Sequence, residues 1–184
     1  DVMIHEDFGF YSYAKHYVLG DVFVLTSPDK EKGTLLELKG KGCRQMESYL
    51  LAQHRSWYDF LMDALIEGGV MKRLDLAIND MAGILDIPEL TEKCNHEECI
   101  SVFRSFKSYR SGELVRSNEQ DRYGMGNTLY IGSLKSEVYF CIYEKDYEQY
   151  VKYDIPIEDT KIKNRFEIRL KNERAYYACL LYTS

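Results

Sequence analysis

Three short segments of the chain alternate between polar and apolar residues, as a half-buried β-strand does. They are residues 73–80, 139–145 and 165–171. Because successive side chains of a strand point to opposite faces, each segment separates into an apolar set and a polar set. The polar sets contain Asp75, Tyr143 and Glu167, together with arginines and lysines. If these strands share a sheet, one face is core and the other has the groups needed for metal-assisted attack on a phosphodiester.

Apolar periodicity and turn residues predict the other elements. Further strands are expected at residues 8–17, 22–26, 34–39, 100–109, 128–132, 137–145 and 162–171. Helices are expected at residues 87–99 and 173–180 and, as the strongest, from Cys43 to about Glu67, either with a bend near His54 or as two shorter helices. Strands and helices do not alternate regularly. We therefore expect an α+β fold with a mainly antiparallel sheet, helices packed on one face, and a polar, catalytic second face.

The bulk composition is that of a globular protein, with 45% hydrophobic and 29% charged residues in a chain of 184. This length suits one domain or two small packed lobes. No apolar stretch approaches the roughly 20 residues that span a bilayer, so no membrane partner is expected. Five cysteines, an odd number without regular spacing, are typical of reduced thiols. These features predict a cytoplasmic protein.

Four motifs, in this order, resemble the Rep_trans family of replication initiators. They are Arg-Leu-Asp-Leu-Ala at 73–77, Thr-Leu-Tyr-Ile-Gly-Ser at 128–133, Ile-Tyr-Glu-Lys at 142–145 and Arg-Phe-Glu-Ile-Arg-Leu-Lys at 165–171. Members start rolling-circle replication of small plasmids or act as relaxases of integrative conjugative elements. Residues 33–44 resemble the N-terminal part of such proteins, especially those of the conjugative-transposon branch. The resemblance implies an N-terminal part at 1–66 and a catalytic core at 67–184, which we expect to be truncated at its C-terminus.

The resemblance implies that Tyr143 is a nucleophile that joins the 5' end of a nicked DNA strand as a phosphotyrosine. A phenol with a pKa near ~10 is a poor nucleophile at neutral pH unless it is assisted. Lys145 and Arg169 are expected to hold phosphate oxygens or the leaving group. The chain has 16 tyrosines, and Tyr130 and Tyr139 are rival candidates for the nucleophile. An ordinary strand tyrosine is the structural alternative for Tyr143.

The same resemblance, together with ligand chemistry, implies that Asp75 and Glu167 bind Mg²⁺ or Mn²⁺, with Asp80 as a third ligand. A structural ion-pair network is the competing interpretation, because three arginines share the expected face. These are Arg73, Arg165 and Arg169. Many relatives have Asp where this chain has Asn79, so one charge near the metal is missing here.

Basic residues alternate with aromatic residues in one stretch, a pattern that suits a phosphate track with stacking platforms for single-stranded bases. The basic residues are Arg104, Lys107, Arg110 and Arg116, and the aromatic residues are Phe103, Phe106 and Tyr109. A strand pair with a solvated basic edge explains the stretch slightly better on sequence alone. The net charge of −6 argues against a simple polycationic DNA binder.

Together these features predict a DNA nicking and strand-transfer enzyme that acts on single-stranded or melted origin DNA of a mobile element. Three alternatives stay open: an origin-binding module without catalysis, a metal-dependent nuclease that uses water, and a structural domain. A homodimer and accessory conjugation or replication proteins such as a helicase are further expected partners.

Overall fold

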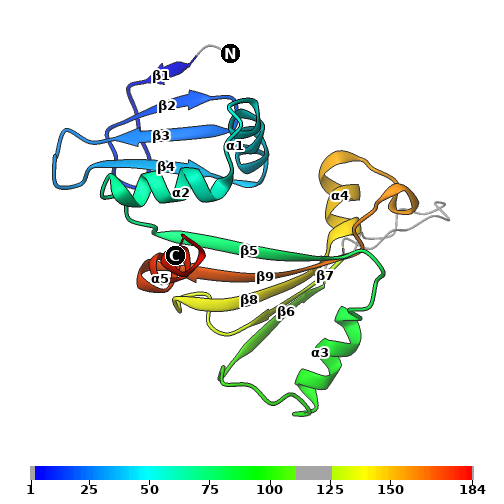
Figure 1. The fold of residues 1–184 in the computed structure, drawn as a ribbon. Coiled ribbons are helices and arrows are strands. Elements are labelled where there is room, and N and C mark those ends of the chain that lie inside the picture. The colour runs from blue at the N-terminus through cyan, green and yellow to red at the C-terminus, as the bar shows by residue number, and fades with distance from the viewer. Residues whose placement is uncertain (1–2, 111–125, 184) are drawn as a thin grey trace. The chain divides into compact units, whose positions relative to one another are not determined.

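The computed structural model describes residues 3–110 and 126–183, which form two compact units. The first unit ends at Gly69, and the second runs from Val70 to Tyr182. In the described residues each unit has one antiparallel sheet accompanied by helices (Figure 1). The expected α+β fold with mainly antiparallel strands is therefore confirmed.

The sheet of the first unit has the strand order β1-β2-β3-β4. Its strands are β1 (Ile4–Glu6), β2 (Lys15–Leu19), β3 (Val22–Thr26) and β4 (Thr34–Leu38). The prediction of a strand from residue 8 to 17 is wrong in its first half. Tyr11 and Ser12 have φ values of 54° and 62°. Such left-handed backbone does not continue a strand, so β2 begins only at Lys15.

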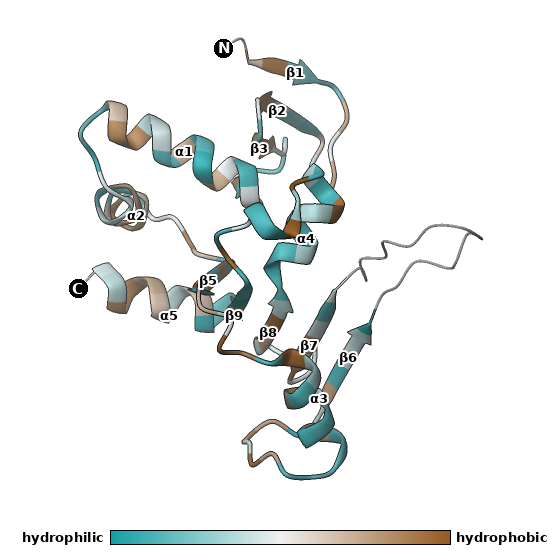
Figure 2. Ribbon diagram, turned by 90° about the vertical axis from the view of Figure 1, so that its right-hand side faces the viewer, coloured by the Kyte–Doolittle hydropathy of each residue, from teal (hydrophilic) through white to brown (hydrophobic). Residues whose placement is uncertain are grey.

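Two helices follow β4, α1 (Gly40–Ala52) and α2 (Trp57–Ile66). Of the two alternatives for this segment, two shorter helices rather than one bent helix are therefore confirmed. His54 has a φ of 56°, which interrupts the helical path. Ser56 then caps α2, because its hydroxyl accepts a hydrogen bond from the Asp59 N–H while the Asp59 carboxylate accepts one from the Ser56 N–H. Figure 2 shows α1 banded in hydrophobic and hydrophilic residues, as expected for a helix with one packed face.

The sheet of the second unit has the strand order β5-β9-β8-β7-β6, and all of its neighbours are antiparallel (Figure 1). Its strands are β5 (Arg73–Asp80), β6 (Phe106–Arg110), β7 (Asn127–Ile131), β8 (Val138–Glu144) and β9 (Asn164–Lys171). The five strands were all expected, although β6 is half as long as predicted. The three segments with alternating polarity are therefore adjacent strands of one sheet.

The pairing register places the predicted polar residues on one face of this sheet. Arg165 of β9 is paired with Asn79 of β5 and with Tyr143 of β8. Directly paired residues share a face, and so do residues two or four apart on one strand. Glu167 and Asp75 therefore lie on the same face as Tyr143. We call this face the polar face.

The opposite face is packed against α3 (Ile87–Asn95). Ile87 of α3, Leu129 of β7 and Ile142 of β8 form a buried cluster. α3 ends four residues earlier than expected, because Glu97 has a φ of 60°. The helix covers only part of this face, since Leu76 and Ile78 of β5 are 49% and 70% exposed.

A helix that the sequence did not predict, α4 (Lys145–Tyr153), begins directly after β8. No side chain caps its N-terminus, and Asp154 rather than glycine adopts the left-handed conformation at its end. The usual cap residues are therefore missing, and the signals present in the sequence are acidic residues in the first turn, Lys152 in the last turn and Pro156 just beyond the end. A short 3₁₀ turn, η1 (Ile157–Asp159), leads to β9, and the expected last helix is α5 (Asn172–Thr183). In the part of the chain that the structure describes, no helix is long and apolar enough to cross a membrane.

Candidate active site

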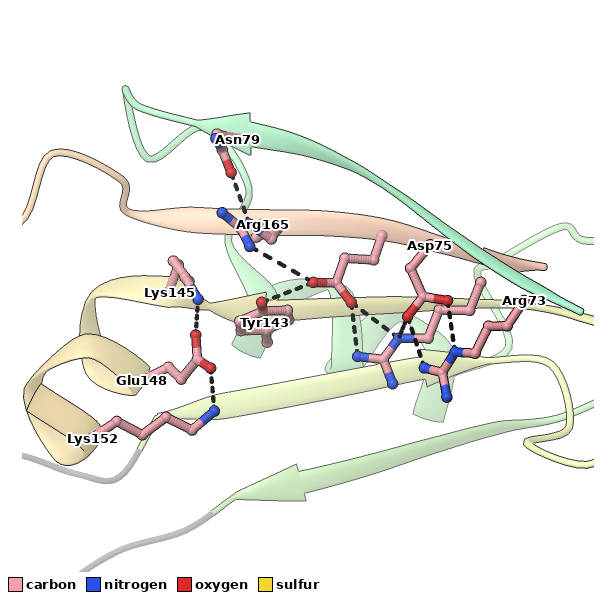
Figure 3. A network of polar contacts seen from close by, with 10 residues as sticks. Arg73, Asp75, Asn79, Tyr143, Lys145, Glu148, Lys152 and Arg165 are labelled. Atoms are coloured by element: carbon pink, nitrogen blue, oxygen red, sulfur yellow. Dashed lines mark hydrogen bonds and ion pairs between the residues drawn. The ribbon is translucent and has the colours of Figure 1, made fainter. Parts of the chain in front are cut away.

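Tyr143 and Glu167 meet at the centre of the polar face. The Tyr143 hydroxyl donates a hydrogen bond to Oε1 of Glu167 at 2.9 Å (Figure 3). The contact is diagonal, because Glu167 is paired with Cys141, which lies two residues before Tyr143 on β8. The predicted nucleophile therefore has a carboxylate acceptor on its hydroxyl.

Glu167 is almost fully buried, with 9% exposure, and its charge is balanced by arginine. Arg169 donates to Oε2 of Glu167 from Nε at 3.0 Å and from Nη2 at 2.7 Å. Arg165 lies farther away, with Nη1 at 4.0 Å from Oε1. A buried carboxylate is stable when it is paired and hydrogen-bonded in this way. The fork from Arg169 fixes the carboxylate so that Oε1 remains for the tyrosine.

Asp75 is linked to the same cluster through Arg169. Arg73 holds Asp75 with two parallel hydrogen bonds, Nε to Oδ1 at 2.9 Å and Nη2 to Oδ2 at 2.7 Å. Nε of Arg169 lies 3.7 Å from Oδ2 of Asp75. One guanidinium therefore contacts Oδ2 of Asp75 and Oε2 of Glu167. The structure brings together the two carboxylates predicted to bind metal, and it also forms the ion-pair network that was the competing interpretation.

Asp80, the third predicted ligand, lies elsewhere. It is the last residue of β5 and points to the face opposite Glu167, where Asn164 is its partner. Its Oδ2 accepts hydrogen bonds from the Leu85 N–H at 2.8 Å and from Nδ2 of Asn164 at 3.0 Å. These bonds, the Asn164 amide first, lower the pKa of Asp80 to about 2. Asp80 therefore orders the loop after β5, and we leave it out of the proposed metal site.

The environment of Tyr143 raises the pKa of its phenol well above the usual value of ~10. Burial is the main cause, followed by the negative charges of Glu167 and Glu148, and Arg165 acts in the opposite direction. In this arrangement the phenol keeps its proton at neutral pH. Attack by Tyr143 therefore requires transfer of that proton to an acceptor.

Lys145, a predicted phosphate contact, opens α4 next to the tyrosine. Its Nζ lies 5.5 Å from the centre of the Tyr143 ring and forms an ion pair with Glu148. Lys152 forms an ion pair with the other oxygen of Glu148 (Figure 3). Glu148 was not among the site residues expected from the sequence. The spacing of Lys145, Glu148 and Lys152, at i, i+3 and i+7, is the helical signal that could have identified it.

The rival tyrosines lie on the same face but are placed differently. Tyr139 is 5% exposed and is covered by Arg169 and Lys171, whose charged groups lie 5.8 Å and 5.0 Å from its ring centre. Tyr130 has its pKa raised, mainly by burial. Among these candidates, as far as the structure describes the chain, Tyr143 is the one whose hydroxyl donates to a carboxylate.

The two predicted DNA-binding residues on β6 do not share a face. Lys107 is paired with Tyr130 and lies on the polar face, whereas Arg110 alternates to the opposite face. Arg104 precedes β6. Arg116 lies outside the described residues.

Residues 69–181 match the family model for the replication initiation factor, Rep_trans. This range contains the whole sheet with Asp75, Tyr143 and Glu167. The chain belongs to the Rep_trans family. Residues 1–63 of this Rep_trans chain also match the N-terminal domain of rolling circle replication initiation proteins.

One curated relative of this Rep_trans chain is a Bacillus subtilis (strain 168) protein named "Putative DNA relaxase NicK". The two are 47% identical over 179 residues, which cover 97% of this chain and 49% of the relative. The chain thus spans about half the length of that relative. A solved structure of a rolling circle replication initiator protein from Geobacillus stearothermophilus has the same fold, with a TM-score of 0.77 and 24% identity. That match covers 98% of this chain and 64% of the other.

Proposed function

We propose that this chain is the nicking core of a DNA strand transferase that cuts one strand at an origin and holds the cut 5' end on Tyr143. The observation that carries the proposal is the 2.9 Å hydrogen bond from the Tyr143 hydroxyl to Glu167. It gives a nucleophile and a proton acceptor in direct contact, in a cluster that also supplies guanidinium groups for phosphate. Membership of the Rep_trans family supports DNA as the substrate.

In the proposed step, Oη of Tyr143 forms a bond to the scissile phosphorus as its proton passes to Oε1 of Glu167. The bond from phosphorus to the 3' oxygen of the preceding nucleotide breaks, and that oxygen leaves as a 3'-hydroxyl after taking up a proton. The products are a 5'-phosphotyrosine and a free 3' end. Because the phosphotyrosine keeps the energy of the phosphodiester, attack by a 3'-hydroxyl reverses the step and reseals a strand without ATP.

Cationic side chains around the tyrosine would hold the phosphate during this step. Arg165 lies beside Tyr143 in the register, and Lys145 lies 5.5 Å from its ring. Both can donate to phosphate oxygens as negative charge develops there. Arg169 is bound to Glu167, and its role is to orient that carboxylate.

Asp75 and Glu167 would hold the Mg²⁺ or Mn²⁺ ion that the family resemblance implies. Oδ2 of Asp75 and Oε2 of Glu167 already face one cationic group, that of Arg169, so the position between them accepts positive charge. Magnesium sites typically use one or two carboxylates and complete the shell with water and substrate phosphate. When bound, the ion supplies charge neutralisation at the scissile phosphate.

A second candidate function is origin binding without catalysis. The observation in its favour is that both carboxylates are engaged by arginines, and that the described residues contain no group of three or more candidate metal ligands. Such a module would bind origin DNA and leave it intact.

The test uses labelled single-stranded oligonucleotides that tile both strands of the DNA flanking the gene. The parent, Tyr143→Phe and Tyr139→Phe proteins are incubated with them in Mn²⁺ or in EDTA and analysed on denaturing gels. We expect a slowly migrating covalent adduct with the parent and with Tyr139→Phe, and none with Tyr143→Phe or in EDTA.

The remaining outcomes separate the alternatives. Cutting without an adduct, unchanged in Tyr143→Phe, would identify a nuclease that uses water. Binding of one oligonucleotide without any cut would identify a binding module. An adduct that persists in Tyr143→Phe and is lost in Tyr139→Phe would move the nucleophile to Tyr139.

A further inference from the structure

Three tyrosines form a row of ring contacts on the polar face. The rings of Tyr109 on β6 and Tyr130 on β7 have centroids 5.7 Å apart and meet at 88°. Tyr130 in turn lies 6.4 Å from Tyr139 on β8. The first of these contacts is edge-to-face, a geometry that fixes the orientation of the two rings, and the second is tilted at 47°. The row joins the outermost strand of the sheet to the strand that carries Tyr143.

Tyr109 lies in the same row of paired residues as the proposed nucleophile. It is paired with Thr128 of β7, and Thr128 is paired with Tyr143 of β8. Neighbouring strands are about 4.8 Å apart, so the two tyrosines are separated by roughly 10 Å across the face. A DNA strand that runs from Tyr143 towards this edge of the sheet would pass over β7 and β6.

The three tyrosines differ in what they can offer to a base. Tyr139 is 5% exposed and covered by cationic side chains. It packs against Tyr130 but has no open ring face for a base. Tyr109 is 52% exposed at the open end of the row. Its edge-on contact with Tyr130 holds the ring while leaving it accessible.

The two aromatic residues that precede Tyr109 in this stretch pack on the opposite face of the sheet. Phe103 packs against Phe140, with ring centroids 5.1 Å apart. Phe106 is paired with Ile131, which packs against the buried cluster beneath α3. Of the three aromatic residues in this stretch, Tyr109 is therefore the one on the polar face.

The charge of the polar face suits a polyanion although the whole chain is acidic. Along β5, β6 and β9 this face has five cationic side chains and two carboxylates. These are Arg73, Lys107, Arg165, Arg169 and Lys171, against Asp75 and Glu167. Lys107 is exposed, lies two residues from Tyr109, and forms no ion pair with any residue in the described ranges.

We infer that Tyr109, held edge-on by Tyr130, is a stacking platform for a base of single-stranded DNA, with Lys107 contacting a neighbouring phosphate. That the ligand is DNA rests on the proposed function. The inference adds a binding subsite two strands away from the nucleophile. Aromatic rings on open sheet faces bind single-stranded nucleic acid by stacking with any base, while lysines contact the backbone.

The first test measures binding by fluorescence anisotropy with a labelled oligothymidylate of about 20 nucleotides, long enough for common single-strand site sizes. EDTA is present, so no strand is cut. We expect Tyr109→Ala to raise the Kd about 5- to 100-fold, the range measured when one stacking ring is removed. Tyr109→Phe should stay within about twofold of the parent, because it keeps the ring. Ser108→Ala, on the same strand and the opposite face, is the matched control.

A second test separates stacking from phosphate contact by using an abasic oligomer of the same length. The parent should bind this oligomer more weakly than oligothymidylate, and Tyr109→Ala should show a much smaller difference between the two. Lys107→Ala should weaken both and reduce the slope of log Kd against log salt by about 1.

Two results would overturn the inference: unchanged binding of oligothymidylate by Tyr109→Ala, or an equal loss on the abasic oligomer. The assay does not depend on nicking, so Tyr143→Phe should bind as the parent does. Loss of nicking without loss of Tyr109-dependent binding would remove the proposed function and leave the stacking site in place.

Discussion

The Tyr143 hydroxyl donates a 2.9 Å hydrogen bond to Oε1 of Glu167, which joins β8 to β9 across the polar face. The other oxygen of Glu167 is held by the fork of Arg169. Because that fork fixes the carboxylate, the tyrosine has one defined acceptor. Burial and the charge of Glu167 raise the pKa of the phenol, which keeps it protonated at neutral pH.

Replacing this acceptor should slow the chemical step. We expect Glu167→Gln to lower the single-turnover nicking rate by about 100-fold to 10,000-fold, the usual effect of removing a general base. The amide keeps the shape of the side chain but loses the charge that pairs with Arg169, so the thermal midpoint should fall, and both rates are measured at a temperature where both proteins are folded. Glu173→Gln, at an exposed position in the first turn of α5, is the control and should nick at the parent rate. A rate for Glu167→Gln within about threefold of the parent would show that Glu167 does not accept the proton.

The pH profile should distinguish two routes of proton loss. The raised pKa of Tyr143 means that free phenolate is negligible at neutral pH. If the proton passes to Glu167, as proposed, the rate of the parent should be nearly flat between about pH 6 and 9. In Glu167→Gln the negative charge is gone, so the pKa of Tyr143 falls, although burial, its main cause, keeps it above the usual ~10. The phenolate fraction then rises about tenfold per pH unit below that pKa, and the rate should rise with it. A parent profile that climbs steeply over this range would contradict transfer to Glu167.

An aspartate at position 79 should not become a ligand of the proposed metal site. Its Oδ1 accepts a hydrogen bond from Nε of Arg165 at 2.8 Å, so an aspartate at this position would pair with that guanidinium. We expect Asn79→Asp to change the nicking rate by less than about threefold. The free energy of unfolding should change by less than about 1 kcal/mol, as for other exposed pairs. Titration with Mn²⁺ followed by electron paramagnetic resonance provides the check, and a tenfold gain in affinity would make residue 79 a ligand.

Asp80 should contribute to stability rather than to catalysis. Asp80→Ala removes two hydrogen bonds from the loop after β5 and one from Asn164 of β9, and we expect a loss of about 1–3 kcal/mol in the free energy of unfolding. Nicking per folded molecule should be unchanged. Urea unfolding and single-turnover nicking measure the two effects, and a large loss of nicking in fully folded protein would return Asp80 to the site.

The stabilisation from Asp80 should also depend on pH in a defined direction. Its folded pKa is about 2, below the ordinary value of ~3.9, so the ionised form favours the folded state. The stability difference between the parent and Asp80→Asn should be complete above about pH 5. It should then diminish as the pH falls from about 4 towards 2.

The sequence by itself determined which residues share a face. Alternation along 73–80, 139–145 and 165–171 placed Asp75, Tyr143 and Glu167 together, because the period of two is a local property of every strand. The same pattern could not show which residues touch. Asp80 was expected as a third ligand from the family resemblance and its carboxylate, and only the loop that folds back onto it reveals its role.

The tertiary structure determines which side chains of the polar face contact one another. The order β5-β9-β8 puts Glu167 beside Tyr143 and lets Arg169 reach Asp75, although the paired segments lie far apart in the chain. Long-range pairing of this kind leaves no periodic trace in the sequence. The same holds for Tyr109, which looked equivalent to Phe103 and Phe106 until the register of β6 on β7 assigned it to the polar face. Local alternation therefore selected the candidate residues, and the strand order, set by packing of the whole sheet, selected which of them can act together.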